Sequence, residues 1–437
     1  MSETTPTATV VSHVLEVLGA AGVRHALLAV PAGFPDEVPG DIDLVVPGES
    51  LPGVAAALRD GLADSGLKVV QVLRHEATAA YVVVGGVLGG AAVAVAFDFC
   101  SDYRKCGVHL IDAEELLSSA SAGKEAPVVA GAAAFGYRLA KSALKGRLPA
   151  DVARLRALAA DAGPTETEAW CRRLFGDGAG ARVAAWLADG GRAPSDEGEL
   201  RRALLRACRK RRGVRGLADT AAEWRRRALR FLRPTGAVVA LLGVDGSGKS
   251  TLARRLADGA LARAFRGVEY RHLRPGLLGA RRSGREAASA PHDQRPYGAL
   301  AAFAKMLYLL ADYRLGGALK DHPARVRSML VLYDRHAADL ALDPRRYRTR
   351  GPWAGRLLSA LVRRPDVTLL ADVEPHVALA RKSEVAEDEL RRSCAVYRAW
   401  AAEGNAVRID ANGEVPEAAA ADAVMRAMSE REWMYQW

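Results

Sequence analysis

A glycine-rich segment in the second half of the chain carries the residue types that phosphate chemistry needs. It reads GVDGSGKST over residues 243–251 and satisfies the pattern GxxxxGK[ST] in full. Glycines let successive backbone amides face the phosphates of a nucleotide, the lysine adds a cation, and the serine hydroxyl ligates magnesium. We therefore expect ATP and Mg²⁺ as cofactors, bound by Gly243, Asp245, Gly246, Ser247, Gly248, Lys249, Ser250 and Thr251.

An aspartate and an arginine follow an apolar run later in the chain. Residues 329–333 (MLVLY) predict a buried strand, and Asp334 and Arg335 come directly after it. In an open α/β sheet, ligands bind at the carboxyl ends of the strands. Asp334 is therefore a candidate magnesium ligand beside Ser250, and the Arg335 guanidinium is a candidate donor to a phosphate oxygen.

A second group of carboxylates lies near the N-terminus. Asp41 and Asp43 stand two residues apart in GDIDLVV (40–46), hence on one face of a predicted strand, and Asp98 lies in the later apolar run 91–99. Acids on adjacent strand ends can hold one or two magnesium ions, as nucleotidyl transfer requires. Asp41, Asp43 and Asp98 are metal-ligand candidates, and a strand start with exposed acids is the alternative.

The elements that must position these groups predict three regions. Strand-like runs alternate with helical stretches over residues 1–113, which predicts an α/β domain, whereas residues 114–233 show only helical spacing and predict an all-helical connector. After Pro234, residues 234–437 alternate strands (237–242, 329–333, 367–373, 406–409) with helices, which predicts a doubly wound parallel sheet. Residues 276–297, rich in Gly, Ala, Arg and Ser, predict a mobile insertion.

The C-terminal motifs together resemble the thymidylate kinase-like P-loop kinases. The resemblance covers residues 236–428 and rests on the glycine loop, on the strand ending in DRH (334–336), on PDVTLLADVEP (365–375) and on VRIDA (407–411). It implies a Mg-ATP-dependent kinase in which Asp334 supports magnesium or the acceptor, Arg335 binds phosphate and a basic lid completes the site. Arg381 and Lys382 occupy the lid position, and Lys382 is one of three lysines after Lys249. Arg391 and Arg392 are weaker lid candidates, more typical of a solvated helix face.

The same resemblance places the phosphate acceptor beside the segment YRHLRPG (270–276). This segment keeps Arg274-Pro275 and lacks the acidic and double-glycine continuation of thymidylate kinases, which leaves the acceptor as a nucleoside monophosphate or another small phosphorylated molecule. The helix 300–314 carries Asp312 and a stripe of Phe303, Met306, Leu307 and Leu310 that predicts mainly core. The acceptor-binding candidates are Arg271, Arg274, Asp312 and Arg335. The resemblance also implies an adenine pocket near residues 411–413 and a homodimer.

The N-terminal region resembles the nucleotidyltransferase fold, whose acids would map to Asp41, Asp43 and Asp98. The glycine-serine pair of that family is replaced by AGFP (32–35), so an active, a degenerate substrate-holding and an unrelated domain all stay open. Two other functions are alternatives to the kinase function. In one, the N-terminal acids transfer a nucleotide to a sugar or small-molecule acceptor; in the other, the P-loop is an ATP-sensing switch for binding of the basic helix 217–232 to nucleic acid or membrane.

Composition limits the classes of protein to which the chain can belong. A chain of 437 residues that is 50% hydrophobic and 26% charged excludes a disulfide miniprotein and disorder over the whole length. A net charge of +11 permits anionic partners without choosing among them, and nucleic acid is a less favoured one than a small phosphorylated molecule. The stretch 81–97 is interrupted by glycines and predicts two strands rather than a membrane span. Five scattered cysteines, with Cys100 and Cys106 as buried thiols, and a start without basic residues predict a cytoplasmic protein.

Overall fold

The computed structural model describes residues 4–105, 108–189, 197–212, 215–278, 295–382 and 386–436. Its contacts divide the chain into two compact units. Unit 1 comprises residues 1–84, 95–232 and 432–437, and unit 2 comprises residues 85–94 and 233–431. The candidate phosphate site lies entirely in unit 2.

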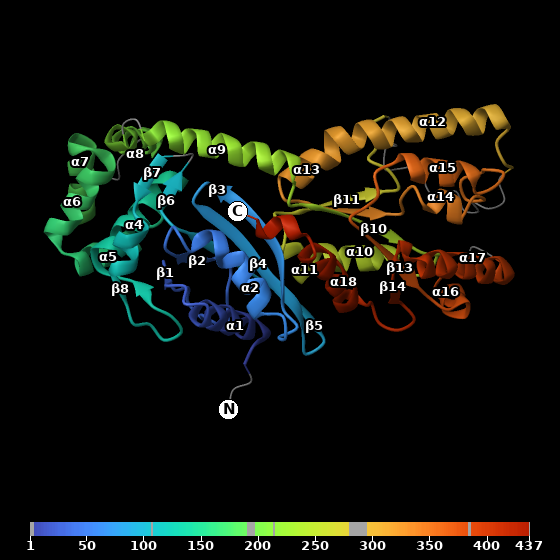
Figure 1. The fold of residues 1–437 in the computed structure, drawn as a ribbon, viewed down its shortest axis with the longest axis horizontal. Coiled ribbons are helices and arrows are strands. Elements are labelled where there is room, and N and C mark those ends of the chain that lie inside the picture. Colours follow the sequence, from blue (N-terminus) through green and yellow to red (C-terminus); the bar gives the residue numbers. More distant parts are fainter. Residues whose placement is uncertain are drawn as a thin grey trace. The chain divides into compact units, whose positions relative to one another are not determined.

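Unit 2 is built on a sheet of five parallel strands in the order β11-β12-β10-β13-β14 (Figure 1). These strands are β11 (Val268–His272), β12 (Leu330–Asp334), β10 (Ala237–Leu242), β13 (Val367–Asp372) and β14 (Val407–Asp410). Every residue of the central strand β10 is buried, as its unbroken apolar run predicts. The expected α/β architecture with a parallel sheet is confirmed, and the carboxyl ends of all five strands share one edge.

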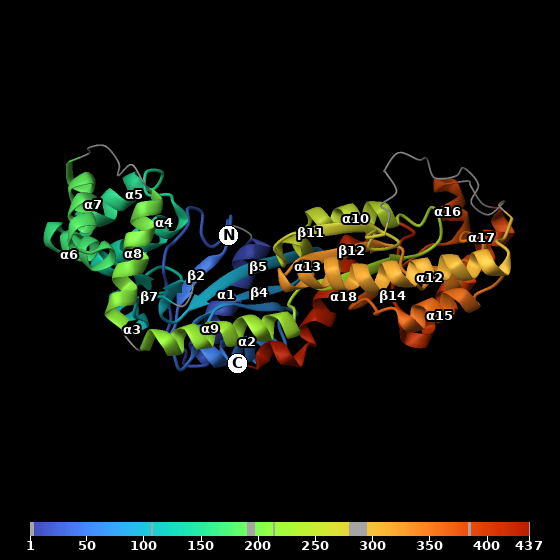
Figure 2. The same ribbon diagram turned by 90° about the horizontal axis from the view of Figure 1, so that it is seen from above.

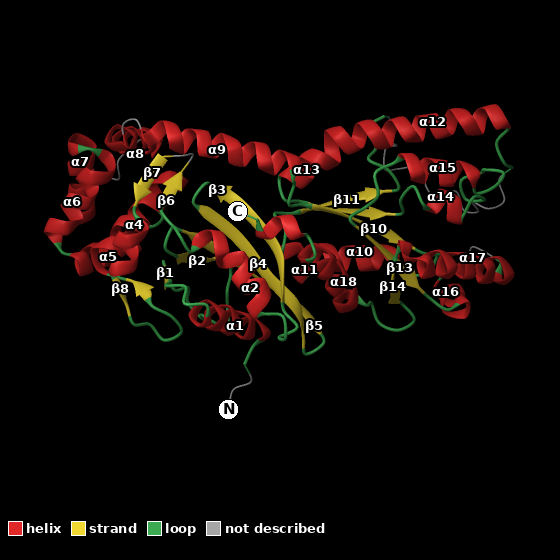
Figure 3. Cartoon of the chain, viewed as in Figure 1, coloured by secondary structure: helices red, strands yellow, loops and turns green. Residues whose placement is uncertain are grey.

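Helices surround this sheet (Figure 3). They are α10 (Lys249–Asp258), α11 (Ala260–Arg263), α12 (Ala299–Gly316), α13 (His322–Val326), α14 (Asp339–Leu342), α15 (Trp353–Leu361), α16 (Pro375–Arg381), α17 (Glu387–Trp400) and α18 (Glu417–Ser429), with π-helical turns η3 (Gly317–Asp321) and η4 (Ala401–Asn405). Leu342 of α14 and Tyr397 of α17 pack on Leu242 and Leu370 of the sheet. This cluster fixes α14 and α17 beside the end of β10.

The core stripe predicted for α12 is wrong at two of its positions. Phe303 and Leu307 are 48% and 47% exposed, whereas Met306, Leu309 and Tyr313 are buried. The inward face is therefore rotated from the predicted one, because α12 packs on α15 and the segment after β12 through Leu309 and Tyr313. Of the predicted insertion 276–297, residues 279–294 lie outside the described residues.

Unit 1 contains a seven-stranded sheet in the order β3-β4-β5-β2-β1-β9-β8. Its strands are β3 (Lys68–Glu76), β4 (Ala79–Leu88), β5 (Ala91–Cys100), β2 (Ile42–Val45), β1 (Ala26–Leu27), β9 (Val128–Val129) and β8 (Ala120–Ser121). The prediction of two strands joined at glycines is confirmed, since Gly89 and Gly90 connect β4 and β5 with φ of 57° and 80°. Among the described residues, no helix is long and apolar enough to cross a membrane.

The remaining elements of unit 1 are mainly helical. They are α1 (Pro6–Ala20), η1 (Leu51–Gly53), α2 (Val54–Gly61), the hairpin β6 (Tyr103–Lys105) and β7 (Val108–Ile111), α3 (Ala113–Ser118), α4 (Gly131–Lys145), α5 (Val152–Ala162), α6 (Pro164–Phe175), α7 (Asp177–Asp189), α8 (Glu197–Arg212), α9 (Arg215–Leu232) and η5 (Glu432–Tyr435). Figure 2 shows α4–α8 gathered at one end of the unit, with α9 running beside the sheet.

The expectation that residues 114–233 are all helical is wrong at β8 and β9. Val128 of β9 pairs in parallel with Leu27 of β1, so this segment completes the N-terminal sheet. Two-residue strands are too short to show an alternating pattern, which explains why the sequence did not predict β8 and β9. Because residues of α4–α8 share one core with Ala26, Val45 and Cys100, a separate helical connector stays a prediction.

Candidate phosphate-binding site

The glycine loop joins β10 to α10 in a conformation that its glycines require. Gly243, Gly246 and Gly248 have φ of +144°, +80° and +83°, which residues with a side chain rarely adopt. A Cβ at Gly246 would lie 2.4 Å from the Ala378 carbonyl oxygen. A Cβ at Gly248 would meet only the Arg381 guanidinium, at 3.9 Å. The loop therefore packs closely against α16 at Gly246 and leaves its surface open at Gly248.

Lys249 begins α10 and is buried, with 6% of its surface exposed. Its Nζ donates to the Val244 carbonyl oxygen at 2.6 Å and to Ser247 Oγ at 3.2 Å. Burial, and next the charge of Arg335, lowers the pKa of the Lys249 ammonium to about 7. The lysine is thus folded onto the glycine loop, and the charges of Asp334 and Asp339 offset the effect of burial on its pKa only in part. Thr251 lies two residues further along, with its amide donating to the Gly248 carbonyl.

Asp334 ends β12 and lies beside the start of α10. Its Oδ2 accepts hydrogen bonds from Ser250 Oγ at 2.9 Å and from the Tyr270 hydroxyl at 2.7 Å. Burial alone would raise the pKa of Asp334, but the nearby Lys249 charge and these two hydrogen bonds hold the pKa below its usual value. The structure therefore brings together the two predicted magnesium ligands, Ser250 and Asp334, as an adjacent hydroxyl and carboxylate. Tyr270 lies in the segment YRHLRPG, and the sequence did not predict its contact with Asp334.

Arg335 follows with a φ of +71° and is 4% exposed. Its guanidinium donates to Asp245 of the glycine loop and to Asp339 of α14, both at 2.6 Å. Burial would lower the pKa of Arg335, yet the charge of Asp339 in particular raises it well above the ordinary value. The Asp-Arg motif is thus connected to the glycine loop by a buried ion pair.

Asp339 is the residue at this site that sequence reasoning missed. It is fully buried and also accepts hydrogen bonds from the Tyr347 hydroxyl at 2.6 Å and from the Tyr397 hydroxyl. Asp245 has a further partner, because Arg346 forms a second ion pair with it. The one available signal was the spacing of Arg335 and Asp339, which places an acid four residues after the arginine.

The four lid candidates lie in two places, two at the end of α16 and two on α17. Arg381, at the end of α16, donates to the carbonyl oxygens of Ala411 at 2.8 Å and of residues 412 and 413 at 3.1 Å. It thereby joins the glycine loop to the segment predicted to hold adenine. Lys382 follows at the end of the same helix, and its charge is among those that lower the Lys249 pKa. Arg391 pairs with Glu387 on the exposed face of α17, and Arg392 is exposed there too.

The acceptor candidates form a folded loop after β11. Arg274 donates to Asp312 Oδ2 at 2.9 Å, and Asp312 also accepts the backbone amides of residues 276–278 at 2.7 to 3.0 Å. Burial would raise the pKa of Asp312, but the amide of Leu278 and the Arg274 guanidinium lower it. Arg271 is paired separately with Glu269 at 2.6 Å and Asp321 at 3.1 Å. Asp312 is fully buried and orders this loop from within.

In unit 1, the three predicted acids do meet. One carboxylate oxygen from each of Asp41, Asp43 and Asp98 lies within 4.8 Å of the others, because β2 and β5 pair in parallel with Asp43 opposite Asp98. Burial, and next the charges of Asp43 and Asp41, raises the pKa of Asp98 to about 8. Lys141 donates to Asp43 and partly offsets this charge. Cys100 is a buried free thiol, whereas Cys106 lies outside the described residues.

Among α/β proteins, a glycine loop that carries a lysine and lies beside an Asp-Arg pair on the neighbouring parallel strand is the arrangement of a P-loop kinase. No protein-family profile matches the chain. Known proteins do: a thymidylate kinase of Xanthomonas euvesicatoria pv. vesicatoria is 30% identical over 212 residues, which are 45% of this chain and 82% of that protein.

Other relatives carry the same name. A thymidylate kinase of Xanthomonas oryzae pv. oryzae is 32% identical over 159 residues, 34% of this chain and 62% of the relative. A probable thymidylate kinase of Methanosarcina barkeri is 29% identical over 151 residues, 33% of this chain and 69% of the relative. The chain belongs to the thymidylate kinase family, and these relatives support a nucleotide kinase-type function.

Proposed function

We propose that the protein transfers the γ-phosphoryl group of ATP, with Mg²⁺, to a nucleoside monophosphate or another small phosphorylated acceptor. The observation that carries the proposal is the 2.9 Å contact of Ser250 with Asp334 directly beside the buried Lys249. A hydroxyl and a carboxylate are the hard oxygen ligands that Mg²⁺ prefers, and a lysine at the start of α10 suits phosphate oxygens. Because the relatives are named thymidylate kinases, thymidine monophosphate is the first acceptor to test.

The residues present fit both cofactors. Gly243, Gly246 and Gly248 form a surface from which side chains are excluded, so that phosphates can approach the backbone amides. Ser250 and Asp334 would hold Mg²⁺, which when bound neutralises phosphate charge. Arg381 fixes the segment 411–413 beside the glycine loop, where the nucleotide base would bind.

Phosphoryl transfer demands alignment and charge neutralisation rather than covalent chemistry from the protein. Lys249 and Arg335 supply positive charge at the loop, and Arg335 is held in position by Asp245 and Asp339. Lys382 adds a further cation beyond α16. Arg274 and Asp312 order the loop after β11 and thereby define where the acceptor binds, with Arg271 buttressing it through Asp321.

The test is phosphoryl transfer from Mg-ATP to a panel of nucleoside monophosphates, sugar phosphates and nucleosides, read by mass spectrometry. The variant is Lys249→Ala, and the matched control is Lys124→Ala, since Lys124 is an exposed lysine with 88% side-chain exposure. We expect the Lys249 variant to lose about 10²-fold or more in kcat while the control retains wild-type turnover. Unchanged turnover in Lys249→Ala would remove the glycine loop from the mechanism.

A second candidate function is nucleotidyl transfer by unit 1, favoured by the convergence of Asp41, Asp43 and Asp98 within 4.8 Å. Its test is Mn²⁺ binding, followed by electron paramagnetic resonance, in wild type and in Asp41→Asn. Metal binding that the substitution abolishes, together with nucleotide transfer that survives Lys249→Ala, would assign the activity to unit 1. Wild-type Mn²⁺ binding in Asp41→Asn would reject the site.

If ATP binds and neither product forms, the ATP-sensing switch is the remaining proposal. Salt-dependent, ATP-modulated binding of nucleic acid or anionic vesicles through α9 would then support it. A homodimer stays a prediction from the family resemblance, and a cytoplasmic location stays a prediction from the scattered cysteines. Sedimentation of the full chain decides the first.

A further inference from the structure

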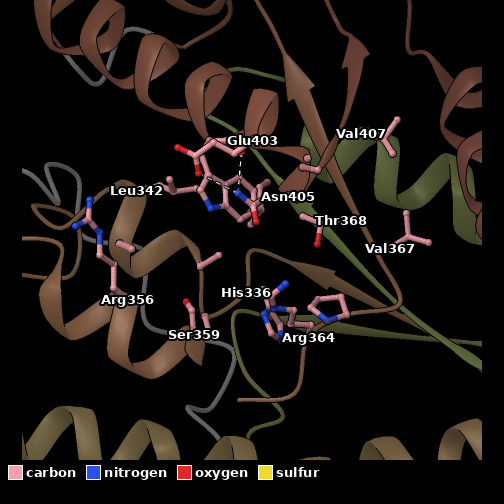
Figure 4. Close-up of a pocket in the computed structure, with 18 of the residues that line it drawn as sticks. His336, Leu342, Arg356, Ser359, Arg364, Val367, Thr368, Glu403, Asn405 and Val407 are labelled. Carbon is pink, nitrogen blue, oxygen red and sulfur yellow. Dashed lines mark hydrogen bonds between the residues drawn. The ribbon is translucent and has the colours of Figure 1, made fainter. Parts of the chain in front are cut away.

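Unit 2 contains a cavity of about 930 Å³ that none of the glycine-loop residues lines. It lies between α15 on one side and the end of α17 with η4 on the other, as Figure 4 shows. Val367 and Val407 are the first residues of β13 and β14, so the cavity extends to the amino ends of these strands. It also reaches Leu242 at the carboxyl end of β10 and His336 just after β12, but none of the residues assigned to the phosphate site lines it. The cavity is therefore a second candidate binding site, of a size that suits a small organic ligand.

Much of the lining is apolar. Leu342 and Val367 are buried, and Trp400 is partly buried and packs on the cluster that contains Leu342. Val396 and Val407 at its edge remain 45% and 46% exposed. A ligand with an aromatic or branched apolar body would remove this surface from water, which is favourable at about 25 cal/mol per Å².

Three arginines, from α15 and the segment after it, give the cavity its charge. They are Arg356, Arg363 and Arg364. All three are exposed, and within the part of the chain that the structure describes none of them has an ion pair or a side-chain hydrogen bond. Unengaged guanidinium groups beside an apolar surface are the donors that a carboxylate, sulfonate or phosphate would engage.

The two acids of the lining do not balance these arginines. Asp366 is already paired with Arg325 and with Arg431, both at 2.9 Å, and its second oxygen accepts the Val238 amide. Burial, and then the charges of Arg363 and Arg431, lowers the pKa of Arg325 although Asp366 opposes this. The other acid, Glu403, accepts a hydrogen bond from Asn405. Positive charge therefore exceeds negative charge here.

A polar side chain of the lining also lacks a partner. Ser359 Oγ is buried and, among the described residues, forms no hydrogen bond. A buried hydroxyl without a partner costs free energy. In Figure 4, Ser359 and His336 lie on one side of the cavity and Glu403 and Asn405 on the other.

We propose that this cavity binds a small amphipathic organic anion, with its apolar body against Leu342, Val367 and Trp400 and its acidic group at Arg363 and Arg364. The proposal goes beyond the phosphotransferase function and does not rest on it. The lining includes His336 and the two alanines that follow it, directly after the Asp334-Arg335 motif.

The test uses 1-anilinonaphthalene-8-sulfonate, an aromatic sulfonate, titrated into the full chain at low salt and followed by energy transfer from tryptophan. The first variant combines Arg356→Gln, Arg363→Gln and Arg364→Gln. Its matched control replaces Arg263, Arg266 and Arg314, three exposed arginines of unit 2, by glutamine and so removes the same charge. We expect the cavity variant to bind at least tenfold more weakly and the control to bind within twofold of wild type.

Two further measurements separate charge from shape. Ala360→Phe, at an exposed lining position, fills the cavity without removing charge and is expected to weaken binding of the sulfonate. The uncharged N-phenyl-1-naphthylamine is expected to bind at least tenfold more weakly than the sulfonate. Equal affinities of the cavity variant and its control, in proteins with unchanged thermal unfolding, would overturn the proposal. Equal affinities of the two probes would overturn its anionic part. Neither result depends on ATP turnover.

Discussion

Asp339→Asn is the substitution whose consequences the structure defines most sharply. The Asp339 side chain has no exposed surface and Arg335 has 5%, so this ion pair is nearly free of water. Removing one partner of a buried pair typically costs about 3–5 kcal/mol, because the other charge is left uncompensated. Asp245 continues to neutralise Arg335, which places the expected loss of unfolding free energy at the lower end, about 3 kcal/mol.

The assay is urea unfolding followed by circular dichroism, paired with kcat for phosphoryl transfer. The matched control is Asp422→Asn, which breaks an Arg-Asp pair of the same four-residue spacing on α18, where Arg426 is 63% exposed. We expect at most about 0.5 kcal/mol from the control. Because Arg335 also loses its orientation, kcat should fall about tenfold in Asp339→Asn. Equal stability losses in the two variants, with kcat unchanged, would refute the role assigned to Asp339.

Three other predictions concern the glycine loop and the neighbouring Asp334. Gly246→Ala should weaken ATP binding at least tenfold in equilibrium dialysis, because of its φ of +80° and the carbonyl at 2.4 Å, whereas Gly317→Ala, which has open space, should bind normally. Lys249→Met should have a larger free energy of unfolding than wild type, because folding lowers the lysine pKa from 10.5 to about 7. The difference should grow as pH falls from about 10 to 7 and stay constant below pH 7. A pH-independent difference in urea midpoints would contradict this. Asp334→Asn should raise the Mg²⁺ concentration for half-maximal turnover about tenfold or more, and an unchanged midpoint would exclude Asp334 as a ligand beside Ser250.

The parts of the site that lie in one continuous segment were predictable from the sequence. The glycine loop needs positive φ, a following helix and a preceding buried strand, and all three leave local traces between residues 237 and 251. The parallel partner of β10 could be found because MLVLY is apolar throughout and ends in an acid. Ser250 and Asp334 are 84 residues apart, and each could be found because it directly follows a feature that the local sequence reveals.

Residues that act through tertiary contacts are harder to recognise in the sequence. Tyr347 and Tyr397 meet at Asp339 from different elements, and neither has a neighbouring residue that marks it as part of a buried network. Asp312 is a second case: its position on α12 predicts a place near the acceptor, and the structure shows in addition that it accepts three backbone amides of the loop after β11. Satisfaction of buried amides by a side chain depends on the fold of the loop, which spacing alone does not reveal.

The sheet of unit 2 could be predicted from the sequence more completely than that of unit 1, for the same physical reason. In unit 2, the fully buried strands β10 and β12 and the glycines of positive φ in one loop leave clear local signals in the sequence. The error on α12 concerned only which face of one helix is buried. In unit 1, the strands β1, β8 and β9 have two residues each, and Val128 enters the sheet only because Leu27 offers an unpaired edge. Pairing of this kind is decided by the packed core around Phe135 and Leu139 and not by local preference. The three acids of unit 1 nevertheless converge, since Asp43 and Asp98 lie on longer strands whose register follows from alternation.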